Sequence, residues 1–348
     1  PATIACRGHA ANLLLAARLP SYEGAMKKRI IILGAVVLLV VLAWTGAWFF
    51  LAGQIRQQVE ALALTDGETS PQLHCGTLEV GGFPFRFDIG CAEASLVSGD
   101  LMLIVPQLNA SAMAWRPTHI IASAQGPAQL SDAFTGLRQD LAWSDLDASL
   151  RLENWRIARL SIQAQDLAWH DRLFGETLIA SAPQLELHLL DMPEQHDPEA
   201  GRAALAGYLR AQAVEAPGIA LAATDAEVEV EVTQLPDDIR NWGVVPLLPD
   251  WQQAGGRLRI VGIRANDGSA DLTATGELSL DSQGYPAGAI TIDSLGVAER
   301  IGPYLEEPWR TLVLGVPGED GRHQNQLNFA GGGLSSGLVP IAQVPPLF

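Results

Sequence analysis

The sequence predicts a mainly β protein: one long, curved, mostly antiparallel sheet with a few packed helices, preceded by a single transmembrane helix. Three observations lead to this prediction. An uncharged apolar run lies near the N-terminus, apolar and polar residues alternate with a period of two in many later segments, and helical periodicity is scarce after the apolar run. Apolar residues make up 48% of the 348 residues, so the chain can bury a sizeable core.

The apolar run is Ile30–Leu51, and it contains no charged residue. A helix of this length spans roughly 33 Å at 1.5 Å per residue, which is enough to cross the hydrocarbon core of a membrane. Basic residues 27–29 precede the run, and the positive-inside rule therefore predicts a cytoplasmic N-terminus. Aromatic residues gather at the other end of the run, where an interfacial belt is expected: Trp44, Trp48, Phe49 and Phe50.

A cleaved signal peptide is the main alternative to a permanent anchor. Its apolar region would be about 7–15 residues long and would end at a small-x-small cleavage site, whereas bulky aromatic residues occupy that place here. A lipoprotein would need a cysteine at position 54, which is Gln54. We therefore expect an uncleaved signal anchor over residues 26–53 in a bacterial inner membrane, with the main domain in the periplasm.

Residues 1–25 end immediately before Met26, a natural start for a signal anchor. We expect them to be a non-native or mis-called N-terminal extension, and a short cytoplasmic tail is the alternative. After the anchor we expect a helical stalk and linker over residues 54–71 and a periplasmic β-rich domain over residues 72–348.

Strands are predicted wherever apolar side chains alternate with polar ones. The clearest run is Asp225–Val232, in which valines and glutamates alternate without a fault. Such strands have one apolar and one polar face, which suits antiparallel sheet. Further runs of this kind include residues 150–153, 185–189, 258–263, 272–280 and 289–293, and residues 282–286 have the composition of a turn.

Few helices are expected in the exported part. Asp197-Pro198-Glu199 resembles a helix N-terminus, with a cap, a proline at the first helical position and an early acid. It predicts a helix that continues to about Val214, with Leu205, Tyr208 and Leu209 as its apolar stripe. Asp237–Trp242 and Val297–Leu305 are weaker candidates.

The charge of the chain excludes one large class of partner. The formal charge is −17, and because residues 1–29 carry five basic residues and one acid, the chain from Ile30 onward carries −21. Such a polyanion repels phosphate backbones, so we expect no nucleic-acid partner. The same field disfavours docking on anionic lipid through a basic patch.

A search for catalytic, cofactor or metal sites finds no convincing constellation. Gly333–Gly337 matches G-x-S-x-G, but no acid or histidine follows it as a nucleophile elbow requires, and we interpret it as a glycine-rich turn. The seven histidines show no metal-ligand spacing, and the carboxylates of Asp145 and Asp147, or of the Asp225–Val232 run, lack a calcium-loop pattern. We therefore predict no catalytic residue, no cofactor and no metal, and we do not expect an enzyme.

The segment Gly82-Phe83-Pro84-Phe85-Arg86 is the most distinctive in the chain. Its glycine supplies φ freedom, and Pro84 interrupts hydrogen bonding along a strand. We expect Phe83, Phe85 and Phe87 to point one way and to fill the core, and a ligand-binding surface is the alternative.

With Cys75 and Cys91 around it, this segment resembles an uncharacterised family of Gram-negative envelope proteins, domain of unknown function 2125. Residues 276–281 with 284–288 resemble its "G-x-L-x-L-D…G-x-P-x-G" hairpin, and residues 337–340 with 344–347 resemble its closing segment. The resemblance extends from about Met26 to the end and implies no established activity. The layout is also loosely similar to AsmA-type envelope proteins, thought to guide lipid along an apolar β-groove, an analogy of fold alone.

A disulfide between Cys75 and Cys91 is expected, because both lie on the oxidising side of the membrane and a turn near Gly82 would bring their flanks together. Two buried free thiols are the alternative.

The functional prediction is a non-enzymatic envelope protein whose sheet presents an apolar face to lipid or to a lipid-carrying partner. A structural scaffold with a sealed β core is the alternative, and an envelope hydrolase with an unrecognised site is a remote one. The oligomeric state is left open. The candidate face comprises Leu185, Leu187, Leu189, Val228, Val230 and Val232.

Overall fold

The computed structural model describes residues 22–68, 71–219, 221–242 and 246–348. The chain divides into two compact units, Pro1–Leu51 and Ala52–Phe348. The predicted extension, residues 1–25, lies almost entirely outside the described residues.

A single long helix, α1 (Tyr22–Leu62), contains the predicted transmembrane segment. From Lys28 onward it is long and apolar enough to cross a membrane. The predicted stalk continues this helix as far as Leu62, and the chain then leaves helical structure.

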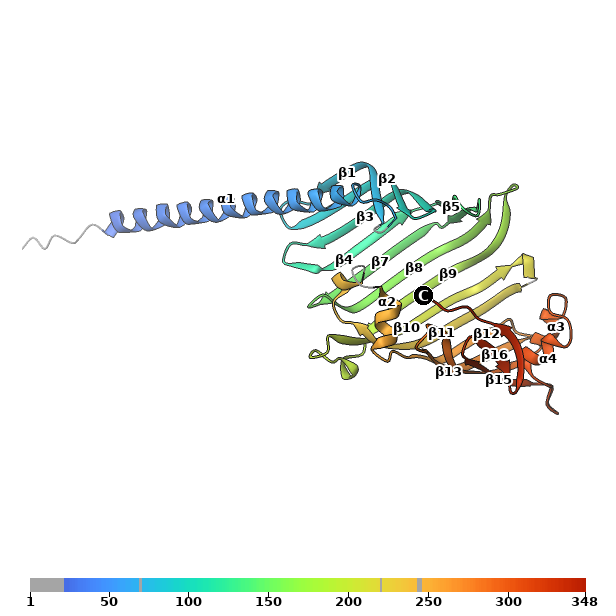
Figure 1. Ribbon diagram of the computed structural model, residues 1–348. Helices are drawn as coiled ribbons and strands as arrows, with labels where there is room; N and C mark the ends of the chain where they lie inside the picture. Colours follow the sequence, from blue (N-terminus) through green and yellow to red (C-terminus); the bar gives the residue numbers. More distant parts are fainter. Residues whose placement is uncertain (1–21, 69–70, 220, 243–245) are drawn as a thin grey trace, which may run out of the picture. The chain divides into compact units, whose positions relative to one another are not determined.

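The second unit is dominated by one antiparallel sheet of 17 strands, drawn in Figure 1. This confirms the predicted fold class. The strands are β1 (Gln72–Gly81), β2 (Arg86–Ser98), β3 (Leu101–Met113), β4 (Arg116–Gln125), β5 (Ala128–Asp132), β6 (Arg138–Ala142), β7 (Asp145–Glu153), β8 (Arg156–Asp171), β9 (Thr177–Asp191), β10 (Arg202–Ala216), β11 (Leu221–Pro236), β12 (Leu258–Asn266), β13 (Asp271–Leu280), β14 (Pro286–Leu295), β15 (His323–Ala330), β16 (Gly333–Ser336) and β17 (Val339–Gln343).

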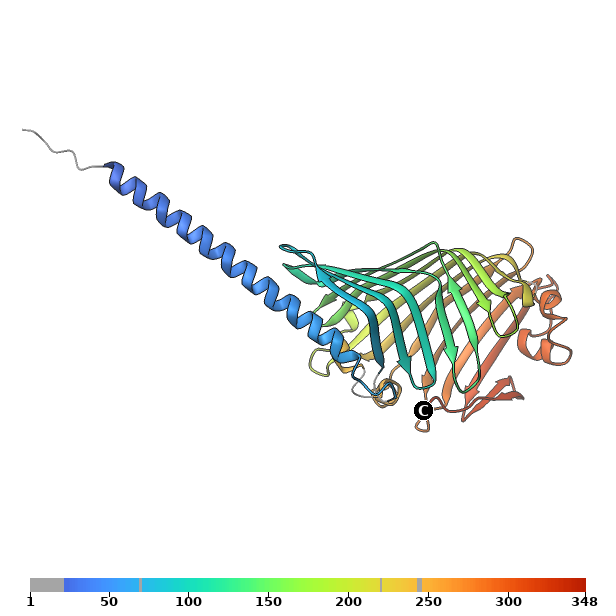
Figure 2. The same ribbon diagram turned by 90° about the horizontal axis from the view of Figure 1, so that it is seen from above.

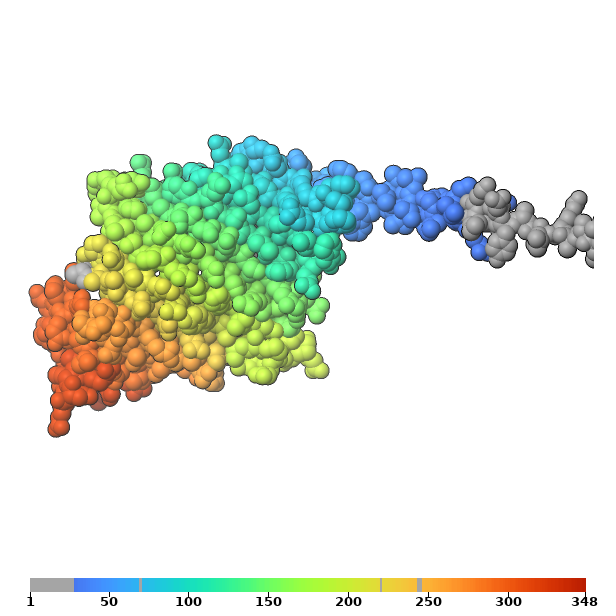
Figure 3. Space-filling view, turned by 180° about the vertical axis from the view of Figure 1, so that it is seen from behind, coloured from blue at the N-terminus to red at the C-terminus, as the bar shows by residue number. Residues whose placement is uncertain are grey.

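The sheet is a meander, in which nearly every strand pairs with its neighbours in the chain. The exceptions are two long strands that each pair with two shorter strands along one edge: β3 pairs with β4 and β5, and β8 pairs with β6 and β7. The sheet curves strongly in the view of Figure 2. Seen from behind, the strands follow one another across the surface in chain order, as the colours of Figure 3 show.

The predicted helix from Pro198 to about Val214 is wrong, because this segment forms strand β10. The Asp197 carboxylate does accept two backbone N–H bonds, from Glu199 and Ala200, but it closes a tight turn there. The stripe of Leu205 and Leu209 fits a period of two as well as a helical period. Pairing with β9 and β11 on both sides selects the strand.

The helices of the second unit are short: α2 (Leu247–Gln253), α3 (Val297–Ile301) and α4 (Trp309–Leu314), with 3₁₀ turns η1 (Pro193–Gln195), η2 (Pro217–Ile219) and η3 (Ile239–Asn241). Two weaker predictions are therefore confirmed in part. The 297–305 segment is helical over its first half, and the 237–242 segment forms only η3.

Helix α2 is fixed to the sheet by polar and apolar contacts. Arg202 of β10 donates to both carboxylate oxygens of Asp250, at 2.5 and 3.0 Å. The Trp251 side chain is buried, and its indole N–H donates to the Thr233 carbonyl at 2.7 Å. Residue 256 must be glycine here, since a Cβ at Gly256 would lie 2.1 Å from the Trp251 indole nitrogen.

Candidate functional site

One face of the sheet is apolar from β2 to β15, and the strand register makes this face continuous. Residues paired across neighbouring strands point to the same side of a sheet. Leu187 of β9 pairs with Ile162 of β8 and with Leu209 of β10, and Leu209 pairs in turn with Val228. The same row continues through Ile263, Ala274 and Ile292 toward the C-terminal strands.

All six candidate residues lie on this apolar face. Leu189 and Val230 face each other across Gly207, and the six side chains are all half-buried. The described strands all belong to one sheet, so no separate second sheet of described strands covers this face. Short segments cover parts of it instead: the end of α1, helix α2 with the C-terminal segment, and helix α3, which lies against β11–β13.

The first cover is the end of helix α1. Val59 lies over β1–β8 and encloses with them a cavity of about 400 Å³. Small side chains on β3, β4 and β7 leave this space open, because alanines stand where larger residues could have filled it. Its lining includes Val59, Cys75, Ala110, Ala122, Ala148 and Ile162.

The sequence did not indicate this cavity, because its floor is made of alanines that alternate with serines. In residues 120–125, Ala122 and Ala124 line the cavity, and Ser123 between them, which also borders it, pairs with the polar residues Asn109 and Asp147. Alanine and serine differ little in hydropathy, so the alternation is easily overlooked. The alternation of alanine with small polar residues was the signal from which this cavity floor could have been predicted.

The second cover is α2 together with the C-terminal segment. Between them and β11–β14 lies a smaller cavity of about 270 Å³, which Val232, Trp251, Leu278 and Leu347 help to line. The two covered regions therefore lie at opposite ends of one apolar face.

The opposite face of the sheet is polar and rich in cross-strand ion pairs. The glutamates of Asp225–Val232 project there, and Arg259 Nη2 lies 2.7 Å from Glu231 Oε1. This hydrogen bond from Arg259 lowers the pKa of the Glu231 carboxyl. Glu227 lies 3.7 Å from Arg210 and 3.9 Å from Arg264. These carboxylates have cationic partners on neighbouring strands, an arrangement suited to a solvated face.

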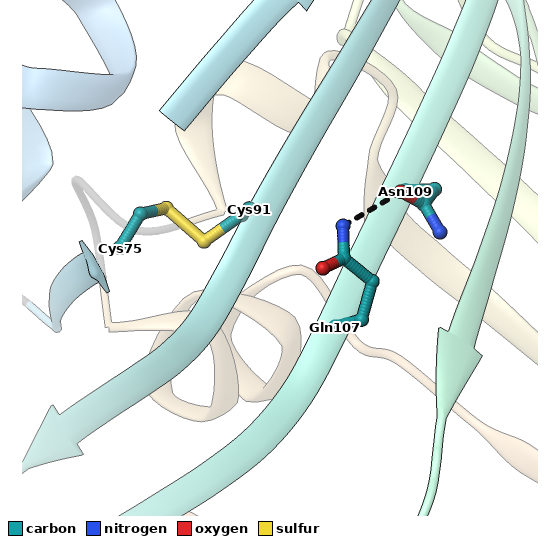
Figure 4. Close-up of a disulfide and its surroundings, with 4 residues drawn as sticks. All are labelled: Cys75, Cys91, Gln107 and Asn109. Carbon is teal, nitrogen blue, oxygen red and sulfur yellow. Dashed lines mark hydrogen bonds between the residues drawn. A yellow bond between two sulfur atoms is a disulfide. The ribbon is translucent and has the colours of Figure 1, made fainter. Parts of the chain in front are cut away.

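Cys75 and Cys91 form a disulfide between β1 and β2, with Cα atoms 5.3 Å apart (Figure 4). The β1–β2 hairpin brings the two strands together as the sequence predicted. Cys91 is buried in a cluster with Ala94, Val105 and Ala128, and Cys75 packs against that cluster. The disulfide thus lies in the wall of the larger cavity.

The Gly82–Arg86 segment forms the turn between β1 and β2, so the expectation of a core-filling strand is wrong for most of it. Phe83 and Phe85 are exposed, and only Phe87, inside β2, is buried. Gly82 has φ +93°, a backbone conformation that few other residues adopt. The period-two interpretation failed because the turn begins at Gly82.

The two other motif regions lie against each other. Gly276 and Gly288 stand on neighbouring strands β13 and β14, where a Cβ would lie 2.3 Å from the Ala289 carbonyl oxygen and 2.1 Å from the Glu277 carbonyl oxygen, respectively. The C-terminal segment docks on the same hairpin, since the Leu347 N–H donates to the Gly284 carbonyl at 2.9 Å. The motif glycines are therefore explained by close backbone contact.

The chemical motifs of the sequence form no catalytic constellation among the described residues. Ser335 lies within strand β16, so the G-x-S-x-G segment is neither a strand-to-helix turn nor the simple turn that we expected. Across residues 22–68, 71–219, 221–242 and 246–348, no group of three metal-ligating side chains gathers.

One polar cluster does join several titratable groups. Arg156 contacts Asp191 at 2.9 Å and His196 at 3.0 Å, and His196 contacts Asp237 at 3.2 Å. These residues connect the loop after β9 with the start of β8 and the end of β11. The arrangement holds the loop on the sheet.

The family model described as "Uncharacterized protein conserved in bacteria (DUF2125)" matches residues 48–345. Neither a curated protein nor a solved structure matches the chain.

Proposed function

Since this chain belongs to the DUF2125 family of uncharacterized bacterial proteins, we propose its function from its structure. We infer that it is a non-enzymatic protein anchored in the bacterial inner membrane, whose periplasmic sheet binds the apolar part of a lipid, either free or presented by a lipid-carrying partner.

The observation that carries the proposal is the continuous apolar face. Its side chains are paired across the register from β2 to β15, while the far side of the same strands is polar. A soluble domain rarely leaves so long an apolar surface without a second layer, unless the surface binds an apolar partner. The cavity of about 400 Å³ beside Cys75 and Ala122 has the size of a small-molecule site.

The proposed compartment follows from two features. Helix α1 has the length and composition of a membrane span, with basic residues just before it. The Cys75–Cys91 disulfide favours an oxidising compartment, which in bacteria is the periplasm. Binding an acyl chain requires apolar surface and no reacting group, which agrees with a non-enzymatic role.

The test uses a photoreactive amino acid in the full-length protein in living cells. Placed at Leu187, it reports on the apolar face, and placed at the adjacent His188, it reports on the polar face of the same strand. We expect lipid adducts from position 187 and few from position 188. Equal yields at the two positions, or no lipid adduct at either in a protein that forms its disulfide, would contradict the proposal.

The scaffold is the second candidate, and the partly covered face supports it. Helix α2 and the C-terminal segment already shield part of the apolar surface around Trp251. If the label at Leu187 reacts only with other parts of this chain, the face is a closed core and the scaffold becomes the better account.

A further inference from the structure

Four exposed aromatic side chains stand on three hairpin turns of the sheet. Phe83 and Phe85 belong to the β1–β2 turn, Trp115 to the β3–β4 turn and Trp155 to the β7–β8 turn. Their exposed fractions are 47%, 57%, 66% and 47%. Single exposed apolar side chains are normal on a protein surface, but a group of them on neighbouring turns is typical of a binding surface.

The three turns lie at one end of the sheet, which we call the stalk end. In an antiparallel meander, alternate turns fall at the same end, and β2, β4 and β8 all begin there (Figure 1). Two of the turns are in direct contact, since the Phe85 and Trp115 rings pack edge to face with centroids 6.0 Å apart. The Phe85 and Trp115 rings therefore bridge two hairpins, and Trp155 stands on the next hairpin turn at the same end.

An arginine follows the last aromatic residue of each turn: Arg86, Arg116 and Arg156. Arg86 and Arg116 are exposed, and Arg86 also pairs with Asp88 at 2.9 Å. Arg156 is engaged with Asp191. A further guanidinium, from Arg240, lies 4.7 Å from the centre of the Trp155 ring. Aromatic rings with nearby basic groups are the side chains typical of the interface between membrane and water.

The chain enters the second unit at this same end. Arg56 lines a hollow together with Gly81 and Gly82, immediately before the β1–β2 turn, while Val59 lies farther along, beside Leu73 and Cys75. The end of the helix reaches the start of β1, where the Gln72 side chain donates to the Ala63 carbonyl at 2.8 Å. The helix thus runs away from the hairpin turns as it proceeds.

Chain connectivity then brings the membrane close to these turns. Arg56 is only five residues after Leu51, the end of the apolar run. Five residues span at most about 18 Å even when fully extended. Whatever the orientation of the sheet, the chain therefore tethers its stalk end close to a bilayer that surrounds the apolar run.

We propose that the three aromatic turns form a membrane-docking surface, which inserts into the interfacial region of the phospholipid bilayer that α1 spans. This inference rests on the proposed role of α1 as a membrane anchor. The attraction is apolar and interfacial in character, because the net charge of −21 beyond Ile30 opposes long-range attraction to anionic lipid. The docked turns hold the end of the apolar face beside the membrane, where a lipid can pass between the two.

The far end of the sheet supplies a matched control. Phe134 and Phe174 stand on turns there and are even more exposed, at 86% and 97%. Their turns are built around carboxylates: Asp132 accepts the Phe134 N–H at 2.8 Å, and Asp171 accepts the Leu173 N–H at 2.7 Å. Exposed aromatic residues and arginines are thus present at both ends, but Arg172 at the far end is paired with Asp140 and Glu176. The stalk end alone adjoins the entering chain.

The experiment uses the full-length protein reconstituted in phosphatidylcholine nanodiscs, with a photoreactive phenylalanine analogue at Trp115 or at Phe134. We expect phospholipid adducts at position 115 in at least tenfold excess over position 134. Adducts should persist at about 1 M salt, where the Debye length is about 3 Å. Comparable yields at both positions, no adduct at 115, or loss of the adduct at high salt would each overturn the docking surface.

A second measurement separates this inference from the proposed function. In a variant with Trp155→Ser, the label at Phe85 should give at least threefold fewer phospholipid adducts, while the label at Leu187 should still capture lipid. Unchanged adducts at Phe85 would overturn the docking surface alone. Loss of capture at Leu187 in the otherwise unmodified protein, with adducts retained at Trp115, would overturn only the lipid-binding face.

Discussion

Two regions of the apolar face, the one over β1–β8 and the one over β11–β14, differ in how closely their side chains are packed. Over β1–β8, small residues such as Ala122 and Ala148 leave a cavity of about 400 Å³ beneath Val59. Over β11–β14, larger residues meet Trp251 and Leu347, and the remaining cavity is about 270 Å³. The first region is cross-linked by the Cys75–Cys91 disulfide. The second is held by side-chain packing and by the Arg202–Asp250 ion pair.

This difference assigns different roles to two parts of one sheet. Protein interiors are close-packed, so a space lined by alanines persists only where the surrounding frame is stiff or a ligand enters. The disulfide and the register of β1 with β2 provide such a frame. We therefore expect ligand binding in the β1–β8 region and the larger share of packing energy in the β11–β14 region.

The largest expected effect tests the packed region. Trp251→Ala should lower the free energy of unfolding by about 3–5 kcal/mol, because it removes a buried indole and leaves a void beside α2. Denaturant unfolding of the full-length protein in detergent, followed by circular dichroism, measures the change. A loss below about 1 kcal/mol would show that α2 contributes little to the packing of this region.

The next largest expected effect tests the β1–β8 region, which contains the disulfide. Replacing Cys75 and Cys91 together by alanine should cost about 3 kcal/mol in the chain-entropy account for a loop of this length. Unreduced mass spectrometry of the natural protein should find no alkylated thiol at these two positions. Two freely alkylated thiols would refute the bond and remove the basis of the comparison.

The sequence predicted the broad fold well, because alternation is unmistakable in strands such as Asp225–Val232, and an uncharged run such as Ile30–Leu51 has few interpretations. The prediction failed at β10. Asp197 can cap a helix or close a tight turn, and the spacing of Leu205 and Leu209 fits both a helical period and a period of two. Only pairing with β9 and β11, which is non-local, decides between them.

The candidate site was predicted only where the alternation along a strand is strong. The six chosen residues lie on the apolar face because their strands alternate large and charged side chains. The larger cavity was missed, since its floor is formed by alanines such as Ala122 on strands with weak alternation. The turn at Gly82–Arg86 was misjudged because exposed Phe85 looks like a core residue when only its apolarity is considered.

A substitution that fills the larger cavity tests the comparison through its effect on lipid binding. Ala122→Leu should reduce lipid capture at Leu187 severalfold, with a stability loss of about 1–3 kcal/mol from overpacking. Ser149→Leu on the neighbouring strand β7 places the same side chain on the polar face, where Ser149 pairs with Ile121, and is the matched control. Equal lipid capture by the two variants would place the ligand elsewhere on the sheet.

The smallest expected effect concerns the ion pair that holds α2. Hydrogen bonds from Arg202 lower the pKa of the Asp250 carboxyl in the folded protein. A lowered folded-state pKa means that the pair adds stability above the ordinary carboxyl pKa of about 3.9, and that this stability is lost as the pH falls through the folded value. Asp250→Asn should therefore cost about 1 kcal/mol at neutral pH and progressively less below about pH 4.

The control for this ion pair lies in the same region of the sheet. Arg257 and Glu277 form a pair at 2.9 Å, but both side chains are more than half exposed. Water screens such a pair, so Glu277→Gln should change stability by less than the Asp250 substitution at neutral pH. Urea titrations of the two variants between pH 3 and 7 make the comparison directly. If the Asp250 variant shows the same loss at both ends of that range, the lowered pKa of Asp250 does not contribute, and α2 is held by Trp251 and its apolar neighbours alone.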